Sequence, residues 1–257
     1  MLSHIPRCGA DPTTPQFRGR CKNLFMTNCA RVFAAAVLLI GLVAAIPARG
    51  AALALVLAID VSASVSADSY LLQHDGIARA FVNRRLVATI SALPGGVEVL
   101  VLEWSDPDRI AVTVDWMRVV DAASAESFAA AVQATQRSSN GLTAIGPALL
   151  AAATVFDRVP EPAARRVIDI SGDGMANFGS PPAQARDHIV AAGITINGLV
   201  IPTDEPWLAD YYRHNVIGGP SAFVVVARTF HHFADAIERK LIEEVAEVPR
   251  QPLAQMQ

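Results

Sequence analysis

The pattern of apolar and polar residues predicts strands that alternate with helices from residue 51 onward. Residues 53–59 (LALVLAI) are all apolar, as expected of a strand that is buried on both faces. Further apolar runs of similar length are separated by segments with helical periodicity. The predicted strands cover 53–59, 97–104, 110–116, 166–171, 194–201 and 222–227, and the predicted helices cover 68–91, 124–137, 145–156, 182–192, 207–215 and 230–248.

This alternation is typical of an α/β protein with a doubly wound, mainly parallel sheet and helices on both faces. The sequence SDPD at 105–108 has the composition of a hairpin turn, so one antiparallel edge strand is expected beside the parallel ones. Ligands of doubly wound sheets bind beyond the carboxyl ends of the strands, where the strand order reverses. Polar residues that follow strands are therefore the first candidates for a binding site.

The first 50 residues have a different pattern, which is typical of a secretory leader. Basic residues at 18–22 precede fifteen uncharged residues at 32–46, and residues 48–50 (ARG) then offer a small-x-small cleavage pattern. A membrane-spanning helix needs about 20 apolar residues, so a signal peptide fits the shorter run better. An uncleaved anchor and a buried core helix are the alternatives. Met26 is an alternative translation start that would give a signal of ordinary length.

We therefore expect a leader at 1–50, a folded domain at 51–248 and a flexible tail at 249–257. All three cysteines lie in the leader, so the mature chain would have neither a thiol nor a disulfide. Removal of the leader takes away six of the 21 basic and one of the 24 acidic side chains, which leaves a net charge of −8. An acidic surface opposes binding to nucleic acid.

Five side chains with oxygen donors occupy the positions where a binding site is expected. Asp60, Ser62 and Ser64 follow the first strand, with one residue between successive members. Thr143 lies just before a predicted helix, and Asp173 lies just after a central strand. Any one of the hydroxyl residues alone is typical of turns and helix caps. Together, on one predicted edge of the sheet, they are the oxygen ligands that hard divalent cations such as Mg²⁺ prefer.

These motifs resemble a known family. The order DVSAS, GLT and SGDG resembles the von Willebrand factor A (vWA) domain and its metal-ion-dependent adhesion site, and the resemblance covers residues 51–248. The segments RRVIDISGDG, ITINGLVI, YYRHNVIGGP and FVVVARTF resemble a bacterial secreted branch of that family, which is catalogued as a domain of unknown function. The resemblance implies a vWA/Rossmann-like fold and a location in the periplasm or outside the cell. Membrane attachment is expected only if the leader stays uncleaved.

The resemblance also implies a role for each site residue. Ser62 and Ser64 would ligate the ion directly, and Thr143 would do so directly or through water. Asp60 and Asp173 would act mostly through bound water and hydrogen bonds to the serines. The expected cofactor is Mg²⁺, with Mn²⁺ or Ca²⁺ as alternatives. An ion without a direct protein carboxylate keeps its affinity for an anionic oxygen, so the expected function is a non-enzymatic module that docks an Asp or Glu of a protein partner.

Two segments near this edge bear on the partner. Residues 175–178 (MANF) stand where family members often have small or polar residues, and an exposed Met175 and Phe178 would alter the rim of the site. Aromatic residues after the strand at 194–201 suit a protein interface, although a short helix packed on the body would contain the same residues. These partner-binding candidates are Trp207, Tyr211, Tyr212 and His214.

A phosphatase of the haloacid dehalogenase type is the main rival reading. That fold is also doubly wound and ends a strand in Gly-Asp-Gly, as residues 172–174 do here, but it requires Asp-x-Asp where this chain has Ser62. It also needs a basic residue, usually Lys, before the Gly-Asp motif. The two lysines of the chain are Lys22 and Lys240, and Arg165 and Arg166 are expected at the far end of the strand. A serine hydrolase would need a Gly-x-Ser-x-Gly motif, which is absent. A vWA scaffold with a non-functional metal site is the third alternative.

Two groups of charged residues are expected to face solvent. Glu98 and Glu103 alternate with apolar residues on a strand predicted to lie at the edge of the sheet. The last helix is expected to present a solvated face formed by Glu238, Arg239, Lys240, Glu243 and Glu244.

Overall fold

The computed structural model describes residues 50–203 and 205–247, so the predicted tail and all but the last residue of the predicted leader lie outside the described residues. The described chain contains one six-stranded sheet in the order β3-β2-β1-β4-β5-β6. Its strands are β1 (Ala51–Asp60), β2 (Val97–Trp104), β3 (Ile110–Val119), β4 (Ala163–Gly172), β5 (Thr195–Val200) and β6 (Val224–Val226). All neighbouring strands are parallel except β2 and β3, so the predicted fold class is confirmed.

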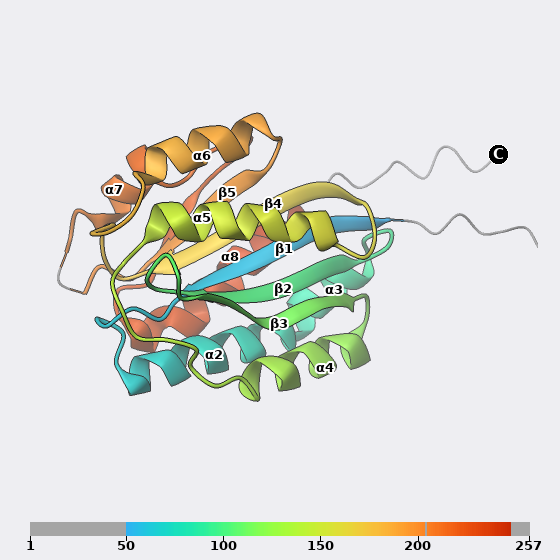
Figure 1. The fold of residues 1–257 in the computed structure, drawn as a ribbon. Coiled ribbons are helices and arrows are strands. Elements are labelled where there is room, and N and C mark those ends of the chain that lie inside the picture. Colours follow the sequence, from blue (N-terminus) through green and yellow to red (C-terminus); the bar gives the residue numbers. More distant parts are fainter. Residues whose placement is uncertain (1–49, 204, 248–257) are drawn as a thin grey trace, which may run out of the picture. The chain divides into compact units, whose positions relative to one another are not determined.

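The strand order reverses at β1. From β1 the chain builds β2 and β3 on one side, and it then crosses back to place β4, β5 and β6 on the other side. The carboxyl end of β1 is therefore the topological switch point of the sheet, where doubly wound folds bind their ligands. In Figure 1 the parallel strands all end on the left.

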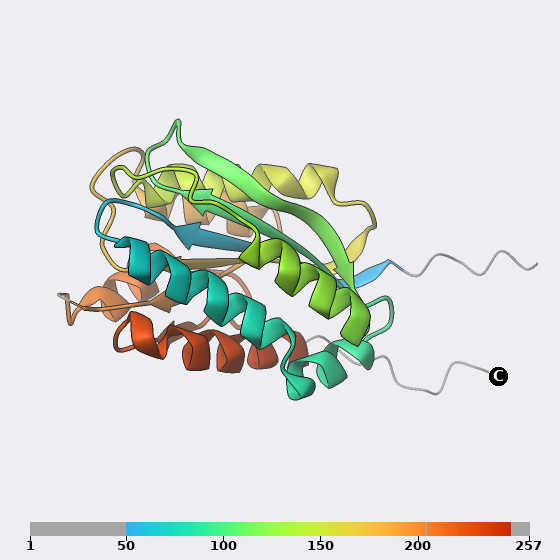
Figure 2. The ribbon, with the colours of Figure 1, turned by 90° about the horizontal axis from the view of Figure 1, so that it is seen from below.

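Helices cover both faces of the sheet, as Figures 1 and 2 show. On one face lie α2 (Ala67–Phe81), α3 (Arg84–Ser91), α4 (Ala122–Gln133) and α8 (Phe233–Ala246), with the short helix η2 (Phe230–His232) before α8. On the other face lie α5 (Ile145–Thr154), η1 (Val155–Arg158), α6 (Pro182–Ala191) and α7 (Leu208–Asn215). None of the helices in the described ranges is long and apolar enough to cross a membrane.

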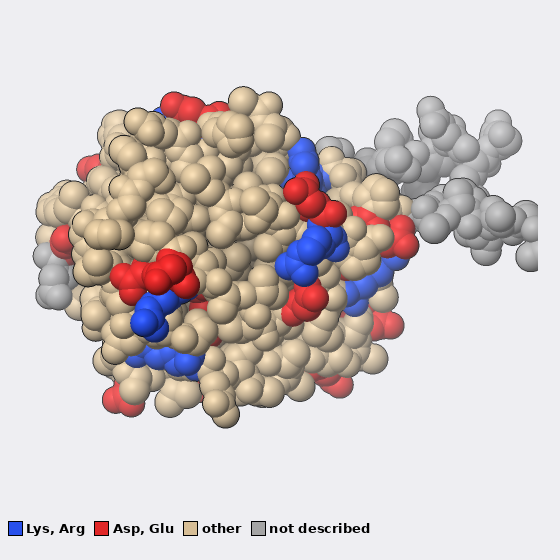
Figure 3. Space-filling view, viewed as in Figure 1, with Lys and Arg blue, Asp and Glu red and all other residues tan. Residues whose placement is uncertain are grey.

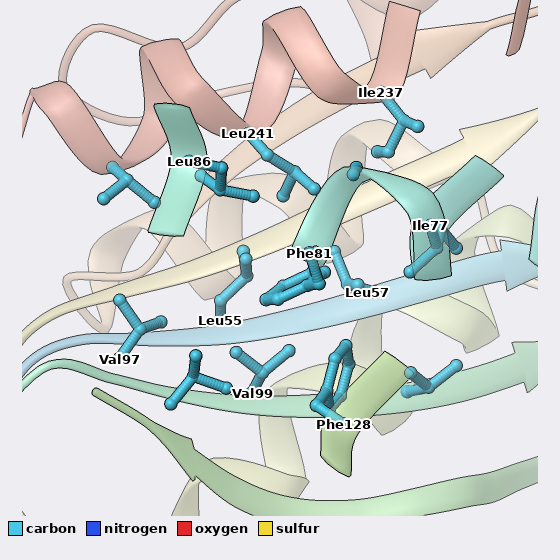
Figure 4. Packing of buried hydrophobic residues seen from close by; sticks show 14 of the residues in the cluster. Leu55, Leu57, Ile77, Phe81, Leu86, Val97, Val99, Phe128, Ile237 and Leu241 are labelled. Atoms are coloured by element: carbon cyan, nitrogen blue, oxygen red, sulfur yellow. The ribbon is translucent and has the colours of Figure 1, made fainter. Parts of the chain in front are cut away.

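The central strand β1 is buried along its whole length, which explains why its sequence is apolar without alternation. Leu55 and Leu57 belong to the apolar cluster on the α2/α8 face, whereas Val56 and Ala58 belong to the cluster on the α5/α6 face. Figure 4 shows Leu55 and Leu57 packed between the sheet and helices on the first of these faces. This two-sided burial supplies the main free energy that stabilises the fold.

The single helix predicted at 68–91 is wrong, because the structure has two helices there. The first helix ends at Phe81, and Asn83 caps the second: its side-chain oxygen accepts hydrogen bonds from the backbone N–H groups of Arg85 (2.8 Å) and Leu86 (3.4 Å). Asparagine is among the preferred N-cap residues. The break was therefore readable in the sequence, although the apolar periodicity continues across it.

The solvent-facing predictions for four charged residues are also wrong. Glu98 and Glu103 are buried, because β2 lies inside the sheet and β3 forms the edge. Lys240 and Glu244 are buried because α8 packs on the sheet there. The ammonium of Lys240 lies 2.7 Å from Asp169 Oδ1 and 3.2 Å from Glu244 Oε2, so these buried charges are paired.

Candidate metal centre

Asp60, the last residue of β1, is fully buried at the switch point. Its Oδ1 accepts a hydrogen bond of 2.8 Å from the backbone N–H of Ser62, and the side-chain amide of Gln73 donates to its carbonyl oxygen (3.1 Å). The other carboxylate oxygen, Oδ2, has no hydrogen-bond partner among the described residues. Burial first, and then repulsion by Asp173, raises the pKa of Asp60 to about 7. A negative charge on this buried carboxylate is costly unless a positive group compensates it.

A chain of hydrogen bonds joins the exits of β1 and β4. The hydroxyls of Ser62 and Ser64 are 3.2 Å apart, and the Ser64 hydroxyl donates to Asp173 Oδ1 at 2.7 Å. Ser62 is buried and Ser64 is exposed, so the pair runs from the interior to the surface. Ser66 then caps α2 by accepting from the backbone N–H of Ser69 (3.1 Å). Of the serines after β1, Ser66 therefore caps α2, whereas Ser62 and Ser64 form the hydrogen-bond chain that leads to Asp173 after β4.

Thr143 lies on a loop that is bonded to both of these exits. Its N–H donates to Asn177 Oδ1 (2.9 Å), and its carbonyl oxygen accepts from the N–H of Asn177 (3.0 Å). The N–H of Ala63 donates to the carbonyl oxygen of Gly141 (2.8 Å). Thr143 itself is buried. The structure thus brings together the three segments that carry the predicted ligands, while the role of these residues as ligands stays a prediction.

Arg137 holds the site loop in place, and the sequence analysis missed it. One of its terminal nitrogens, Nη2, donates to the carbonyl oxygens of Val61 and Ser62, both at 2.8 Å, and Nε donates to that of Ser139 at 2.9 Å. These bonds satisfy backbone groups that have left the β1 ladder. The only sequence signal was a single arginine at the start of a Ser-Ser-Asn-Gly loop, which does not identify its partners.

Glu103 anchors the same loop from β2. Its Oε2 accepts from the N–H of Ser138 (2.7 Å), and its Oε1 accepts from the Tyr70 hydroxyl (3.0 Å) and lies 3.0 Å from His74 Nε2. Burial opposes the charge of Glu103, but the hydrogen bonds from His74 and Ser138 outweigh it and hold the pKa below its ordinary value. This buried cluster therefore supports the wall of the site formed by residues 137–139.

Tyr212 was predicted to belong to a partner-binding surface, and the structure contradicts this. Its side chain is fully buried, because α7 turns that face toward the sheet. A Cβ placed on Gly172 would overlap the Tyr212 hydroxyl and would lie 3.0 Å from Asp60 Oδ2, so both oxygens border the space above this glycine. The Tyr212 hydroxyl has no hydrogen-bond partner among the described residues. Burial, and then the charges of Asp60 and Asp173, raises its pKa well above the ordinary value.

The other aromatic candidates remain at the surface. Trp207 and His214 are exposed, and Tyr211 is half-buried. The Tyr211 hydroxyl accepts a hydrogen bond of 3.3 Å from the N–H of Ala176, which follows β4, and its ring stacks edge-to-face on that of Trp207. The beginning of α7 is therefore tied to the loop that carries Asp173. No group of three or more His, Cys, Asp or Glu side chains suited to a metal occurs among the residues that the structure describes.

Residues 50–249 match the family model described as "Protein of unknown function (DUF1194)". The chain belongs to this DUF1194 family. The comparison with curated proteins gives no match. The family shown here agrees with the resemblance read from the sequence, which named a branch of vWA domains known only as a domain of unknown function.

Solved structures establish the fold as vWA-like. The DUF1194 chain matches proximal thread matrix protein 1 from the mussel byssus with a TM-score of 0.56 and 14% identity, over 77% of this chain and 48% of that one. It matches a von Willebrand factor type A protein from Catenulispora acidiphila with a TM-score of 0.54 and 20% identity, over 76% and 42%. It matches the vWF domain of the type V pili tip protein Mfa5 from Porphyromonas gingivalis with a TM-score of 0.55 and 11% identity, over 80% and 98%.

The DUF1194 chain thus spans about half the length of the mussel protein. That protein has also been solved with a zinc-occupied MIDAS motif, and this structure matches at a TM-score of 0.52 and 16% identity, over 76% of this chain and 47% of that one. At such identities the similarity establishes the fold alone.

Proposed function

We propose that this chain is a non-enzymatic, extracytoplasmic binding module that docks an acidic residue of a protein partner through a divalent cation. The proposed site comprises Asp60, Ser62, Ser64, Thr143 and Asp173. The observation that carries this proposal is the buried Asp60 carboxylate, whose Oδ2 is unpaired among the described residues beside the Ser62–Ser64–Asp173 chain. A cation would compensate a charge that the protein otherwise buries at a cost.

The donor set fits a hard divalent cation. It contains two carboxylates and three hydroxyls, and it has neither an imidazole nor a thiol, which favours Mg²⁺ with Mn²⁺ or Ca²⁺ as alternatives. The Ser62 and Ser64 hydroxyls, 3.2 Å apart, are close enough to serve one ion. The zinc-occupied MIDAS motif of the mussel protein supports a divalent cation in general, without indicating which one. When bound, the ion would supply the positive charge that the partner's carboxylate recognises.

The protein's own residues give the site an inner and an outer side. Asp60 and Ser62 are buried, whereas Ser64 is exposed, so a partner would approach from the side of Ser64. The leader pattern supports a location in the periplasm or outside the cell. Lys240, the one lysine in the described ranges, is paired with Asp169 and Glu244 under α8. It is therefore committed elsewhere, which argues against the phosphatase reading.

Isothermal titration of Mg²⁺ and Mn²⁺ into the full chain tests the metal site. We expect binding by the wild type and by Asp75→Ala, which removes an exposed carboxylate on α2, and none by Asp60→Ala. Absence of binding to a folded wild type would refute the proposal and favour the scaffold alternative. Capture from the chain's own cell envelope, with Mg²⁺ or with EDTA, then tests docking: retention that needs both the metal and Asp60 supports it, and retention indifferent to both contradicts it.

A further inference from the structure

Four large apolar side chains are exposed around the proposed cation site. Their exposed fractions are 45% for Leu142, 42% for Met175, 53% for Phe178 and 47% for Trp207. They come from the loop before α5, the loop after β4 and the start of α7. We call these four residues the apolar rim. Exposed apolar residues that gather at a functional edge mark an interaction surface, whereas isolated ones need no explanation.

Hydrogen bonds and a ring contact connect the segments that carry the apolar rim. Leu142 and Phe178 flank the doubly hydrogen-bonded pair formed by Thr143 and Asn177. Trp207 contacts Tyr211, and the Tyr211 hydroxyl bonds to Ala176, which lies between Met175 and Asn177 in the chain. Each rim residue is therefore adjacent in the chain to, or in contact with, one of the residues that join the loops of Thr143 and Asp173 to α7.

The loop that carries Met175 and Phe178 is held firmly. Ala176 is hydrogen-bonded to Tyr211, and Asn177 is hydrogen-bonded to Thr143. The side chains of Met175 and Phe178, on either side of these two residues in the chain, are exposed to solvent. Gly179 then adopts φ +83°, and a Cβ there would lie 2.6 Å from Pro147 Cγ. Only glycine fits this turn without strain. A loop whose backbone is held in place before binding loses less conformational entropy when a partner docks.

Charge decides which partner suits this surface. The described ranges contain no exposed lysine, and the Arg137 guanidinium is occupied by three carbonyl oxygens. The exposed Arg109 and Arg213 are paired with Asp106 and Asp210, and the exposed Arg228 follows the edge strand β6. In the proposed function the cation recognises the partner's carboxylate, while the rim would receive an apolar group. On the one face of the molecule that Figure 3 shows, acidic and basic side chains lie in small mixed groups. A lipid bilayer fits less well, because covering the rim would also remove water from Ser64 and Asp173.

We infer that the partner segment places a large apolar side chain, aromatic or aliphatic, beside its acidic residue, and that the apolar rim receives this side chain. This inference rests on the proposed cation site for the acidic half of the contact. A few apolar anchors in a desolvated surface commonly carry most of the binding free energy of an interface.

Selection from a displayed library of random peptides on the immobilised full chain, with Mg²⁺ and elution by EDTA, tests the inference. We expect the eluted peptides to carry an Asp or Glu close to a Phe, Trp, Leu or Met. A double variant, Phe178→Ser with Trp207→Ser, should bind a selected peptide about tenfold or more weakly, with unchanged Mg²⁺ titration. The matched control, Leu71→Ser with Leu150→Ser, alters exposed apolar residues of α2 and α5 and should bind as the wild type does.

The outcomes separate this inference from the proposed function. Acidic, EDTA-eluted peptides without an apolar preference would overturn the rim and leave the cation site standing. Recovery of basic peptides that resist EDTA would overturn both, and so would a wild type that binds no metal. Failure to enrich any peptide would count against the rim. Binding to phosphatidylcholine vesicles that depends on Phe178 and Trp207, but not on metal, would assign the rim to a membrane and refute the inference.

Discussion

Ser64 donates a hydrogen bond of 2.7 Å to Asp173, which lies 109 residues later in the chain. This bond links the exits of β1 and β4, the two neighbouring strands at the switch point. It also brings the carboxylate of Asp173 toward Asp60. The pKa of Asp60 is raised first by burial and then by the charge of Asp173. The same relationship leads to predictions about pH, metal and packing.

Without metal, the free energy of unfolding should fall as pH rises from about 4 to about 7. The folded pKa of Asp60 is about 7 against an ordinary 3.8, so the folded state binds the proton more tightly across this window and stability is lost as the proton leaves. The shift corresponds to at most about 4 kcal/mol. In EDTA at pH 8, urea unfolding should show Asp60→Asn to be more stable than the wild type.

Asp75→Asn is the matched control for this comparison, because that carboxylate is exposed on α2. It should keep the wild-type dependence of stability on pH. Equal dependence in Asp60→Asn and the wild type would show that Asp60 does not titrate as the geometry requires.

Added Mg²⁺ should stabilise the folded protein. A ligand that binds only the folded state, at 100 times its Kd, raises the free energy of unfolding by about 2.7 kcal/mol. Thermal or urea unfolding should show this gain in the wild type and in Ser127→Ala, which alters an exposed serine of α4, but not in Ser62→Ala. A full gain in Ser62→Ala would remove this hydroxyl from the set of ligands.

Gly172→Ala should weaken both the fold and the metal site. The new Cβ would overlap the Tyr212 hydroxyl and lie 3.0 Å from Asp60 Oδ2, and such overpacking typically costs about 1–3 kcal/mol. Gly174→Ala is a close control, because a Cβ there meets nothing within 4 Å. Urea unfolding and Mg²⁺ titration should both separate the two variants. Similar results for both would show that the space above Gly172 is not restrictive.

Lys240→Met should be strongly destabilising. It leaves the buried carboxylates of Asp169 and Glu244 without their ammonium partner, and breaking a buried pair costs about 3–5 kcal/mol. Burial already raises the pKa of Asp169 to about 6, and loss of the lysine would raise it further. Acidification should therefore restore part of the stability, in contrast to Arg239→Met on the exposed side of α8. A deficit independent of pH would contradict this explanation.

Arg137→Met should reduce metal affinity without removing any ligand. The guanidinium bonds to the carbonyl oxygens of Val61 and Ser62, the first two residues of the site loop after β1. Loss of groups that orient metal ligands typically lowers affinity by about tenfold or more. Calorimetric titration should show this loss relative to the wild type and to Arg79→Met, an exposed arginine of α2. Unchanged affinity would mean that the loop holds its position without Arg137.

The positions of Asp60 and Asp173 in the candidate site were predictable because both follow the ends of buried strands. An apolar run that stops at Asp60 places that carboxylate at a strand exit, and Asp173 is placed in the same way by β4. The burial of Tyr212 could not be predicted, since an aromatic residue suits both an interface and a core. Its position is decided by the orientation of α7 against the sheet, which depends on contacts far away in the sequence.

The sequence by itself determined the doubly wound α/β class, the two-sided burial of β1 and the set of polar residues at the carboxyl edge, because these follow from local periodicity and from where each apolar run ends. Only the tertiary structure decided that β2 lies inside the sheet and that Lys240 pairs with Asp169. It alone also placed the unpaired oxygen of Asp60 beside Tyr212 above Gly172. Burial and pairing of this kind depend on which segments, distant in the sequence, come into contact in the folded chain. The residues around any one position do not specify those contacts.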